Sequence, residues 1–225
     1  TQKWKVIDGL QRMTSIIKFF SSDEWRLSNL SDVRPELRGV TNSELRDGSE
    51  EQKLLYSMVE NVSIPITVIR CDYLIKSHMS YLFTIFHRLN SGGVRLTNQE
   101  IRNCIYTGRF NDFLKRFDKS NTAWKELQKR IYGKMHRFRS TEILLRTLAF
   151  SENIYQYDGN LAKFLNEFMH RRMTIADGEL ALFENKLSDI CRWAVQILAS
   201  EQKKKQSLSL VESVMIGLYV NHSSL

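Results

Sequence analysis

The sequence predicts an α+β protein that is mostly helical. Only two of its 225 residues are proline, Pro35 and Pro65, and long segments repeat apolar residues at helical spacing. Only two short segments are rich in β-branched residues, which are typical of strands. With 42% hydrophobic and 26% charged residues, the chain has an ordinary globular composition. Its length suits one large domain or two small ones.

The first part of the chain is predicted to contain both helices and strands. Residues 3–7 read as a strand and residues 9–20 as a helix, whose Leu10, Met13, Ile17 and Phe20 share one face. Residues 21–50 are irregular because turn-forming residues interrupt them, and they leave room for short strands. Residues 50–60 read as a helix. The β-branched segment 65–70 reads as a second strand.

From about residue 75 the pattern is helical. Leu82, Ile85, Phe86 and Leu89 mark one apolar face, which ends at Ser91-Gly92-Gly93. Thr97-x-x-Glu100 is a capping box that predicts a helix to about residue 106. Further helices are predicted over 110–117, 122–132, 141–150, 160–172, 178–200 and 207–220, with their apolar faces in the core. We therefore predict an α+β portion in residues 1–75 and a helical domain in residues 76–225.

Net charge and cysteine content indicate the kind of partner and the redox compartment of the protein. The net charge of +8 and the pI of about 9.4 suit a polyanionic partner such as DNA. The three cysteines are too far apart for a zinc site and predict buried thiols in a reducing cytoplasm. No apolar run approaches the roughly 18 residues of a membrane span, and no secretory signal is present. Thr1 enters a predicted strand almost directly, so we expect a piece of a longer protein.

The segment Ile7-Asp8-Gly9-Leu10-Gln11-Arg12-Met13-Thr14 has the most informative pattern in the chain. A strand, an acid–glycine turn and a helix start bring a carboxylate, an amide and a guanidinium close to unpaired backbone amides, where phosphate binds readily. Asp8-x-x-Gln11 is also a capping box, and spacing alone favours that reading. Capping explains Asp8 and Gln11 but leaves Arg12 unexplained.

A second polar segment runs from Phe86 to Asn103 around Gly92-Gly93, where a ligand can approach the backbone closely. Its polar contacts would come from Asn90, Arg95, Gln99, Arg102 and Asn103. The alternative is a helix C-cap at one glycine followed by the Thr97 capping box, and spacing alone favours it.

A basic stretch with interleaved aromatic residues runs from Lys129 to Arg139 and is a candidate nucleic-acid surface. A solvated helix face is the alternative, and the pattern favours it. The basic residues are Lys129, Arg130, Lys134, His136, Arg137 and Arg139, with Tyr132 and Phe138 between them.

Several enzyme classes are excluded by missing motifs. The sequence has no P-loop, no G-x-G-x-x-G and neither G-x-S-x-G nor H-E-x-x-H. Its five histidines show no metal-ligand spacing, so no metal site is predicted from the protein alone.

Taken together, the two polar segments resemble the N-terminal domain family of GmrSD-type restriction endonucleases. The family's I-D-G-Q-Q-R-[LM]-T segment is matched from Ile7 to Thr14, and its F-x-R-L-N-[ST]-G-G-x-x-L-[ST]-x-x-E-[IL]-R-N segment from Phe86 to Asn103. Weaker matches, E-x-[IL]-L-R-x-x-A and F-L-N-x-[FY]-M, cover residues 142–149 and 164–169. The resemblance spans residues 4–170 in the same order.

The resemblance implies a partial ParB/sulfiredoxin-like fold in residues 1–75 and a role in prokaryotic defence. Family members bind and hydrolyse nucleoside triphosphates, with Mg²⁺ the expected metal, and couple this to recognition of modified phage DNA and to a separate HNH nuclease domain or subunit. Asp8 would hold magnesium or orient water, Gln11 would position a phosphate or water, and Arg12 would neutralise phosphate charge. The phosphate-binding residues would be Gly9, Arg12, Thr14, Asn90, Ser91, Gly92, Gly93 and Asn103.

Two departures from the family pattern keep other functions open. Leu10 replaces the first glutamine of the pair, and the family's upstream strand with its own Q-R motif, which would come before Thr1, is absent from this sequence. No nuclease motif is present in this chain. The alternatives are a non-catalytic ParB-like DNA-binding module and a regulatory scaffold with a degenerate site. Leu10 has the helical spacing of a core residue with Met13 and Ile17, so we predict that it points inward.

Overall fold

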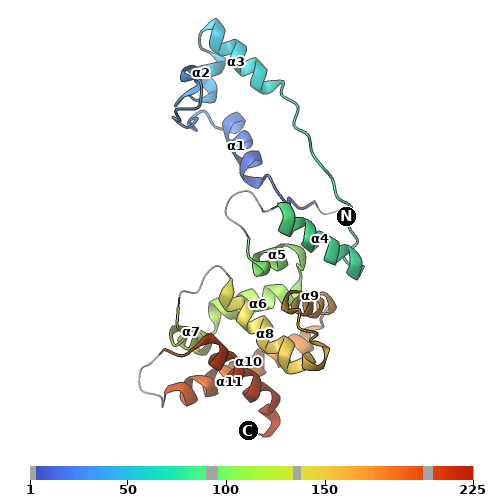
Figure 1. The fold of residues 1–225 in the computed structure, drawn as a ribbon. Coiled ribbons are helices and arrows are strands. Elements are labelled where there is room, and N and C mark those ends of the chain that lie inside the picture. The colour runs from blue at the N-terminus through green and yellow to red at the C-terminus, as the bar shows by residue number, and fades with distance from the viewer. Residues whose placement is uncertain (1–3, 90–95, 134–137, 200–204, 225) are drawn as a thin grey trace. The chain divides into compact units, whose positions relative to one another are not determined.

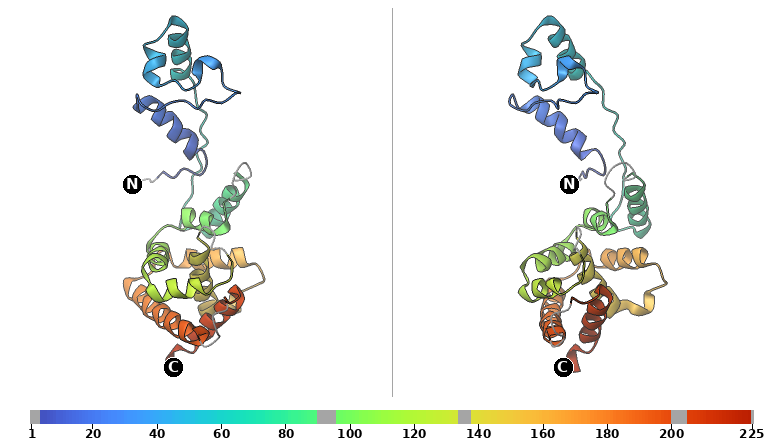
Figure 2. Two further views of the ribbon diagram at one scale, coloured as in Figure 1. Left: turned by 90° about the vertical axis from the view of Figure 1, so that its left-hand side faces the viewer. Right: turned by 60° about the vertical axis from the view of Figure 1, so that its left-hand side comes forward.

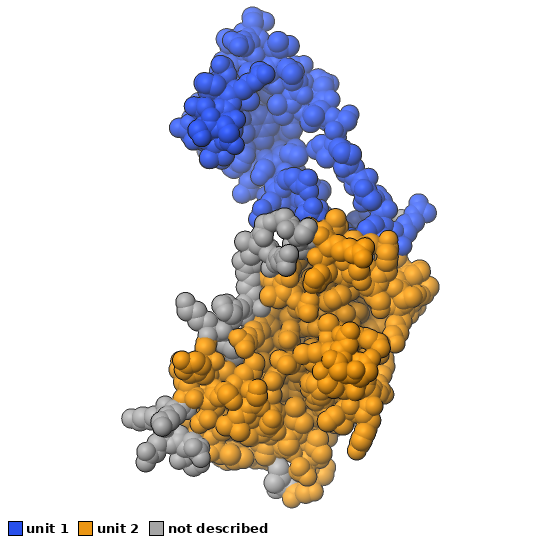
Figure 3. All heavy atoms as spheres, viewed as in Figure 1, with its two compact units in different colours: residues 1–70 blue, residues 71–225 orange. Residues whose placement is uncertain are grey.

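The structure of the protein is a computed structural model that describes residues 4–89, 96–133, 138–199 and 205–224. Helices dominate these residues, as Figure 1 shows, so the predicted helical class is confirmed. The chain forms two compact units, unit 1 over residues 1–70 and unit 2 over residues 71–225, coloured separately in Figure 3. None of the described helices is long and apolar enough to cross a membrane.

Unit 1 contains short helices joined by irregular chain. They are α1 (Leu10–Ser21), the 3₁₀ turn η1 (Pro35–Leu37), α2 (Asn42–Arg46) and α3 (Glu50–Glu60). Helix α2 packs on α3, and capping boxes at Thr41 and Ser49 start these two helices. The guanidinium of Arg26 donates to both carboxylate oxygens of Glu44 at 3.1 Å, and so ties the irregular segment to α2.

The predicted strands are not observed. Residues 4–7 and 65–70 form no strand, and the only β-pairing among the described residues is two isolated bridges, Arg26 with Thr41 and Ile131 with Gln206. The apolar side chains that alternate along the second segment, Ile64, Ile66 and Val68, are exposed. A strand needs a partner for its backbone hydrogen bonds, so β-propensity alone does not make a sheet. The α+β part of the predicted class is therefore not shown.

Unit 2 is a bundle of packed helices, shown from two further sides in Figure 2. Helix α8 (Arg139–Asn153) packs against four others: α5 (Asn98–Ile105), α6 (Arg109–Ser120), α9 (Leu161–Arg171) and α11 (Leu208–Val220). Helix α10 (Asp177–Ala199) packs against α6, α7 (Thr122–Lys129) and α11. Helix α4 (Lys76–Leu89) packs against α5 and α9. The 3₁₀ turns η2 (Ile154–Gln156) and η3 (His222–Ser224) follow α8 and α11.

The core of unit 2 is built from the apolar faces predicted from sequence. On α9, Phe164, Leu165, Phe168 and Met169 are buried, and the ring of Phe110 meets that of Phe168 edge-on at 5.8 Å. Such aromatic pairs add about 0.5–1.5 kcal/mol to the free energy of area burial. The predicted capping box of α5 is also confirmed, because Thr97 Oγ1 accepts from the Glu100 amide and Glu100 accepts from the Thr97 amide.

The prediction of three buried cysteines is wrong in part. Cys191 is buried in α10, and burial raises the pKa of its thiol to about 12. Cys71 is partly exposed and Cys104 is exposed, because Cys104 lies on the outer side of α5. The predicted absence of a disulfide holds among these residues.

Candidate functional site

The start of α1 has the backbone geometry that the first polar segment predicted. Gly9 precedes the helix with φ 87° and ψ 6°, in the left-handed region that glycine enters without strain. The first helical hydrogen bond runs from the Met13 amide to the Gly9 carbonyl at 2.8 Å, so the amides of Leu10, Gln11 and Arg12 precede the helical ladder. Gln11 and Arg12 thus lie in the first turn, as predicted.

The capping box predicted for Asp8 and Gln11 is not formed. Gly9 takes the capping position, no side chain caps the helix, and Asp8 lies one residue farther out. The Asp8 carboxylate instead accepts from Arg12 Nη2 at 2.9 Å, with the two side chains 56% and 77% exposed. This leaves a carboxylate, a guanidinium and unpaired amides together on one accessible turn, which we call the Asp8–Arg12 turn.

The remaining predicted residues of this helix are exposed. Thr14 donates its hydroxyl to the Leu10 carbonyl at 2.7 Å, within the helix. The prediction that Leu10 points inward is wrong: its side chain is 64% exposed, and Met13 and Ile17 are exposed too. Helical spacing places these residues on one face but does not supply another element to cover it, and Phe19 is the buried residue of α1.

The glycine turn of the second polar segment lies outside the described residues. Asn90, Ser91, Gly92 and Gly93 belong to it, as does Arg95, and α4 ends at Leu89 just before them. The expected approach of Arg12 to the 90–97 segment therefore stays a prediction.

The end of the second segment is buried in unit 2. Arg102, on α5, is almost completely buried and its guanidinium has three side-chain partners. Its Nε donates to Asn166 Oδ1 at 2.9 Å, and its Nη1 donates to Gln99 Oε1 at 3.0 Å and to Glu142 Oε2 at 3.2 Å. Burial lowers the pKa of Arg102, and the charge of Glu142 opposes this shift. A buried guanidinium needs such partners, because an unpaired buried charge is very costly.

Sequence reasoning missed this cluster, which we call the Arg102 cluster: Gln99, Arg102, Glu142 and Asn166. The family resemblance held a signal, because Glu142 and Asn166 occupy fixed positions in the two weaker motifs. Glu142 and Asn166, from the two weaker motifs, thus contact the guanidinium of Arg102, which belongs to the second polar segment. Their role here is to join α5, α8 and α9.

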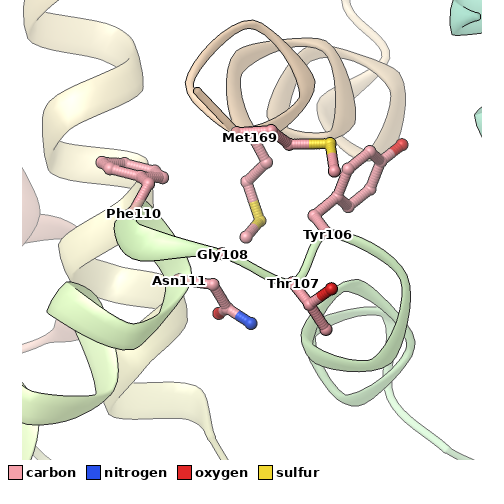
Figure 4. A pocket seen from close by; sticks show the side chains of 7 residues that line it. Tyr106, Thr107, Gly108, Phe110, Asn111 and Met169 are labelled. Atoms are coloured by element: carbon pink, nitrogen blue, oxygen red, sulfur yellow. The ribbon is translucent and has the colours of Figure 1, made fainter. Parts of the chain in front are cut away.

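Asn103 also lies in the interior of unit 2. Its Oδ1 accepts from Gln99 at 3.4 Å and its backbone carbonyl accepts from Asn111 at 3.3 Å. The hollow beside Asn111 is shown in Figure 4, with Tyr106, Phe110 and Met169 around Gly108. It has no free volume for a water molecule, so this hollow offers no room for a phosphate.

The basic stretch is only partly described. Lys129 and Arg130 both lie within ion-pair distance of Glu126, at 3.2 and 3.7 Å, and Arg139 is the first residue of α8. Lys134, His136 and Arg137 lie outside the described residues. Tyr132 and Phe138 are exposed. The nucleic-acid surface assigned to this stretch stays a prediction.

A larger groove in unit 2 was not predicted. It lies between α4 and α9, encloses about 400 Å³, and its walls include Phe83, Tyr106 and Asn166. Its rim carries Lys76, which pairs with Glu167 at 2.8 Å, and Lys163. We call it the α4–α9 groove. Its lining residues come from segments far apart in the sequence, so their spacing could not predict the groove.

Among the described residues, no three histidine, cysteine, aspartate or glutamate side chains gather as a metal site. A magnesium ion at the Asp8–Arg12 turn would thus have Asp8 as its protein carboxylate. Mg²⁺ is commonly bound by one or two carboxylates together with the phosphates of its ligand, so a single carboxylate suits a metal that arrives with a nucleotide.

Comparison with protein families identifies the class of protein as a component of a restriction system. Residues 1–107 match the family described as GmrSD restriction endonuclease, N-terminal domain, the family that the two polar segments resemble. The match includes the Asp8–Arg12 turn and the whole of α5. No curated protein and no solved structure matched the chain.

Proposed function

We propose that this chain is the nucleotide-dependent sensing module of a cytoplasmic anti-phage restriction system. It binds a nucleoside triphosphate with Mg²⁺ at the Asp8–Arg12 turn and serves a nuclease domain or subunit outside this chain. The observation that supports this best is the start of α1, where an exposed guanidinium, an exposed carboxylate and unpaired amides share one turn. Helix N-termini of this kind bind phosphate.

Each residue of the turn has a chemical role in the proposal. Arg12 exchanges its exposed pair with Asp8 for phosphate oxygens, and Gly9 lets the ligand approach the backbone. Asp8 holds magnesium, which would supply charge neutralisation at the phosphates. Gln11 is exposed and orients a phosphate or a water molecule. Thr14, on the second turn of α1, completes the proposed site on unit 1.

Calorimetry with Mg–ATP and Mg–GTP tests the proposal. Arg12→Ala removes a charge-assisted phosphate contact and should weaken binding by roughly 1.5–3 kcal/mol. Asp8→Asn should retain triphosphate binding in part and lose magnesium-dependent phosphate release, because an amide is a poor magnesium ligand. Lys18→Ala, at the other end of α1, is the control and should bind like the unchanged protein. Absence of nucleotide binding by the unchanged protein contradicts the proposal.

A DNA-binding module is the second candidate function, favoured by the net charge of +8. DNA affinity in the absence of nucleotide that falls steeply with salt would support it, because neutralised phosphates release counterions. A regulatory scaffold would show neither nucleotide hydrolysis nor such DNA binding.

A further inference from the structure

The α4–α9 groove has the size and walls of a small-molecule site. Its volume of about 400 Å³ lies within the roughly 300–1,000 Å³ of ligand pockets. Met79, Phe83 and Tyr106 give it an apolar lining, and Asn166, Lys76 and Lys163 give it polar groups. Unit 2 alone supplies all of these residues.

Asn166 presents a hydrogen-bond donor to the groove. Its side chain is only 9% exposed, and its Oδ1 accepts from Arg102 Nε at 2.9 Å. Arginine nitrogens only donate, so the atom facing Arg102 must be the oxygen and the amide orientation is determined. The Nδ2 group then lies on the other branch of the amide, and none of the described residues accepts a hydrogen bond from it. Asn166 lines the groove, so this amide group can donate to a molecule bound there.

Further donors surround Asn166. Asn166 lies in the second turn of α9, and Asn160 caps the start of this helix by accepting from the Lys163 amide at 3.0 Å. The amides of Leu161 and Ala162 precede the first helical hydrogen bond, so they add positive potential. Lys163 pairs with Asp158, and its side chain is exposed to solvent. Glu167, the carboxylate that lines the groove, forms an ion pair with Lys76. The groove therefore presents several donors, and the carboxylate in its lining is already paired.

We propose that the α4–α9 groove binds a nucleotide, with an acceptor atom of the base on Asn166 Nδ2 and the phosphate near Lys163 and the start of α9. Phe83 and Tyr106 supply apolar surface for the base. The choice of ligand rests on the proposed function. The groove adds a nucleotide-binding surface in unit 2, which the Asp8–Arg12 turn does not include.

Asn166→Asp tests the groove without removing its support. Aspartate still accepts from Arg102 and so preserves the Arg102 cluster, but it replaces the donor with an anionic acceptor. We expect the Kd for Mg–ATP, measured by calorimetry on the full chain, to rise at least about ten-fold, because the hydrogen bond to the base is lost and an anionic oxygen faces the base acceptor instead. Asn153→Asp is the matched control: Asn153 also accepts from an arginine, Arg171, at 3.4 Å, but lies outside the groove. It should leave the Kd unchanged.

Ala162→Glu is a second, independent variant. A carboxylate in the first turn of α9 favours the helix, so the protein should fold as well as before. The same carboxylate extends into the groove and repels an anion, so Mg–ATP binding should fall at least about ten-fold. An unchanged Kd in either folded variant overturns the groove proposal and leaves the Asp8–Arg12 proposal intact.

The Arg12→Ala variant separates the two proposals. Binding that is lost in the groove variants but kept in Arg12→Ala supports the groove and contradicts the Asp8–Arg12 site. If the unchanged protein binds no nucleotide, both proposals are overturned. Binding of short single-stranded DNA in the groove without binding of Mg–ATP would likewise overturn the assignment to a free nucleotide.

Discussion

Arg12 and Arg102 show how differently one residue type is used in this chain. Arg12 lies on an exposed turn with one carboxylate partner four residues away, and an exposed pair of this kind is worth about 0.2–1 kcal/mol. Such a weak pair can be exchanged for a phosphate at little cost. Arg102 is buried with three partners on three helices, and its guanidinium is committed to structure.

Arg102→Met should destabilise the protein by about 3 kcal/mol, because Glu142, Gln99 and Asn166 lose a buried partner. Arg109→Met is the matched control: Arg109 pairs with Asp177 at 2.9 Å, but both side chains are exposed. The control should cost less than about 1 kcal/mol. Urea denaturation measures both variants. Equal losses of unfolding free energy in the two variants would contradict a stabilising role for the Arg102 cluster.

Leu10→Gln tests whether the departure from the family pattern disables hydrolysis. Leu10 is 64% exposed, so the change should leave the melting temperature unaltered. We expect triphosphate hydrolysis to rise at least ten-fold, about 1.4 kcal/mol of barrier, because a polar group returns beside Gln11. Ile17→Gln is the control, since Ile17 is 60% exposed on the same helix but two turns away. No gain in the Leu10 variant would show that the residue at this position does not limit hydrolysis.

At the scale of elements, the start of α1 depends on one glycine. Gly9 holds a left-handed conformation, and a Cβ there would lie 3.4 Å from Arg12 Nη2. Glycine thus permits the left-handed backbone conformation at which the helix starts, and the guanidinium lies in contact distance of this position.

Gly9→Ala should lower nucleotide affinity about five-fold or more, because the left-handed conformation that starts the helix costs an alanine roughly 1 kcal/mol. Gly9→Asn should lose less, since asparagine tolerates this conformation. Gly178→Ala, within α10 and facing open space, is the control and should bind normally. Calorimetry with Mg–ATP gives the three affinities. A Gly9→Ala affinity equal to that of the control would remove the turn from the proposed site.

At the scale of the whole molecule, the packed core of unit 2 raises the pKa of buried tyrosine and cysteine side chains. Burial raises the pKa of Tyr106 to about 12 and that of Cys191 to about 12, and it also raises the pKa of Tyr219. The unfolded chain releases these protons near pH 9 for cysteine and near pH 10 for tyrosine.

These three groups should therefore leave the free energy of unfolding unchanged below about pH 9 and lower it as the pH rises toward 12. Each group contributes up to about 1.4 kcal/mol per pH unit in that window, because the folded state holds a proton that the unfolded state has lost. Tyr106→Phe should make the fall shallower. Tyr155→Phe, at a fully exposed position, should not. Urea denaturation at several pH values measures the slopes, and identical slopes for the two variants would contradict the burial argument.

The helices could be predicted closely because their signals are local. Apolar residues at helical spacing and the capping box at Thr97 determine where α5 and α9 begin and which faces they bury. The two predicted strands failed because strand pairing is not local. Residues 65–70 have strand propensity, but no described segment pairs with them.

The sequence by itself determined the helical class, the family of residues 1–107, and the glycine–arginine helix start at Gly9 and Arg12. These depend on neighbouring residues, whose spacing sets backbone conformation and hydrogen bonding. Only the tertiary structure decided that Asp8 pairs with Arg12, that Leu10 is exposed, and that Asn166 joins Arg102 to a groove. Burial and pairing depend on which distant segments pack together, because the low dielectric of a packed core forces polar groups such as Arg102 to find partners across the fold.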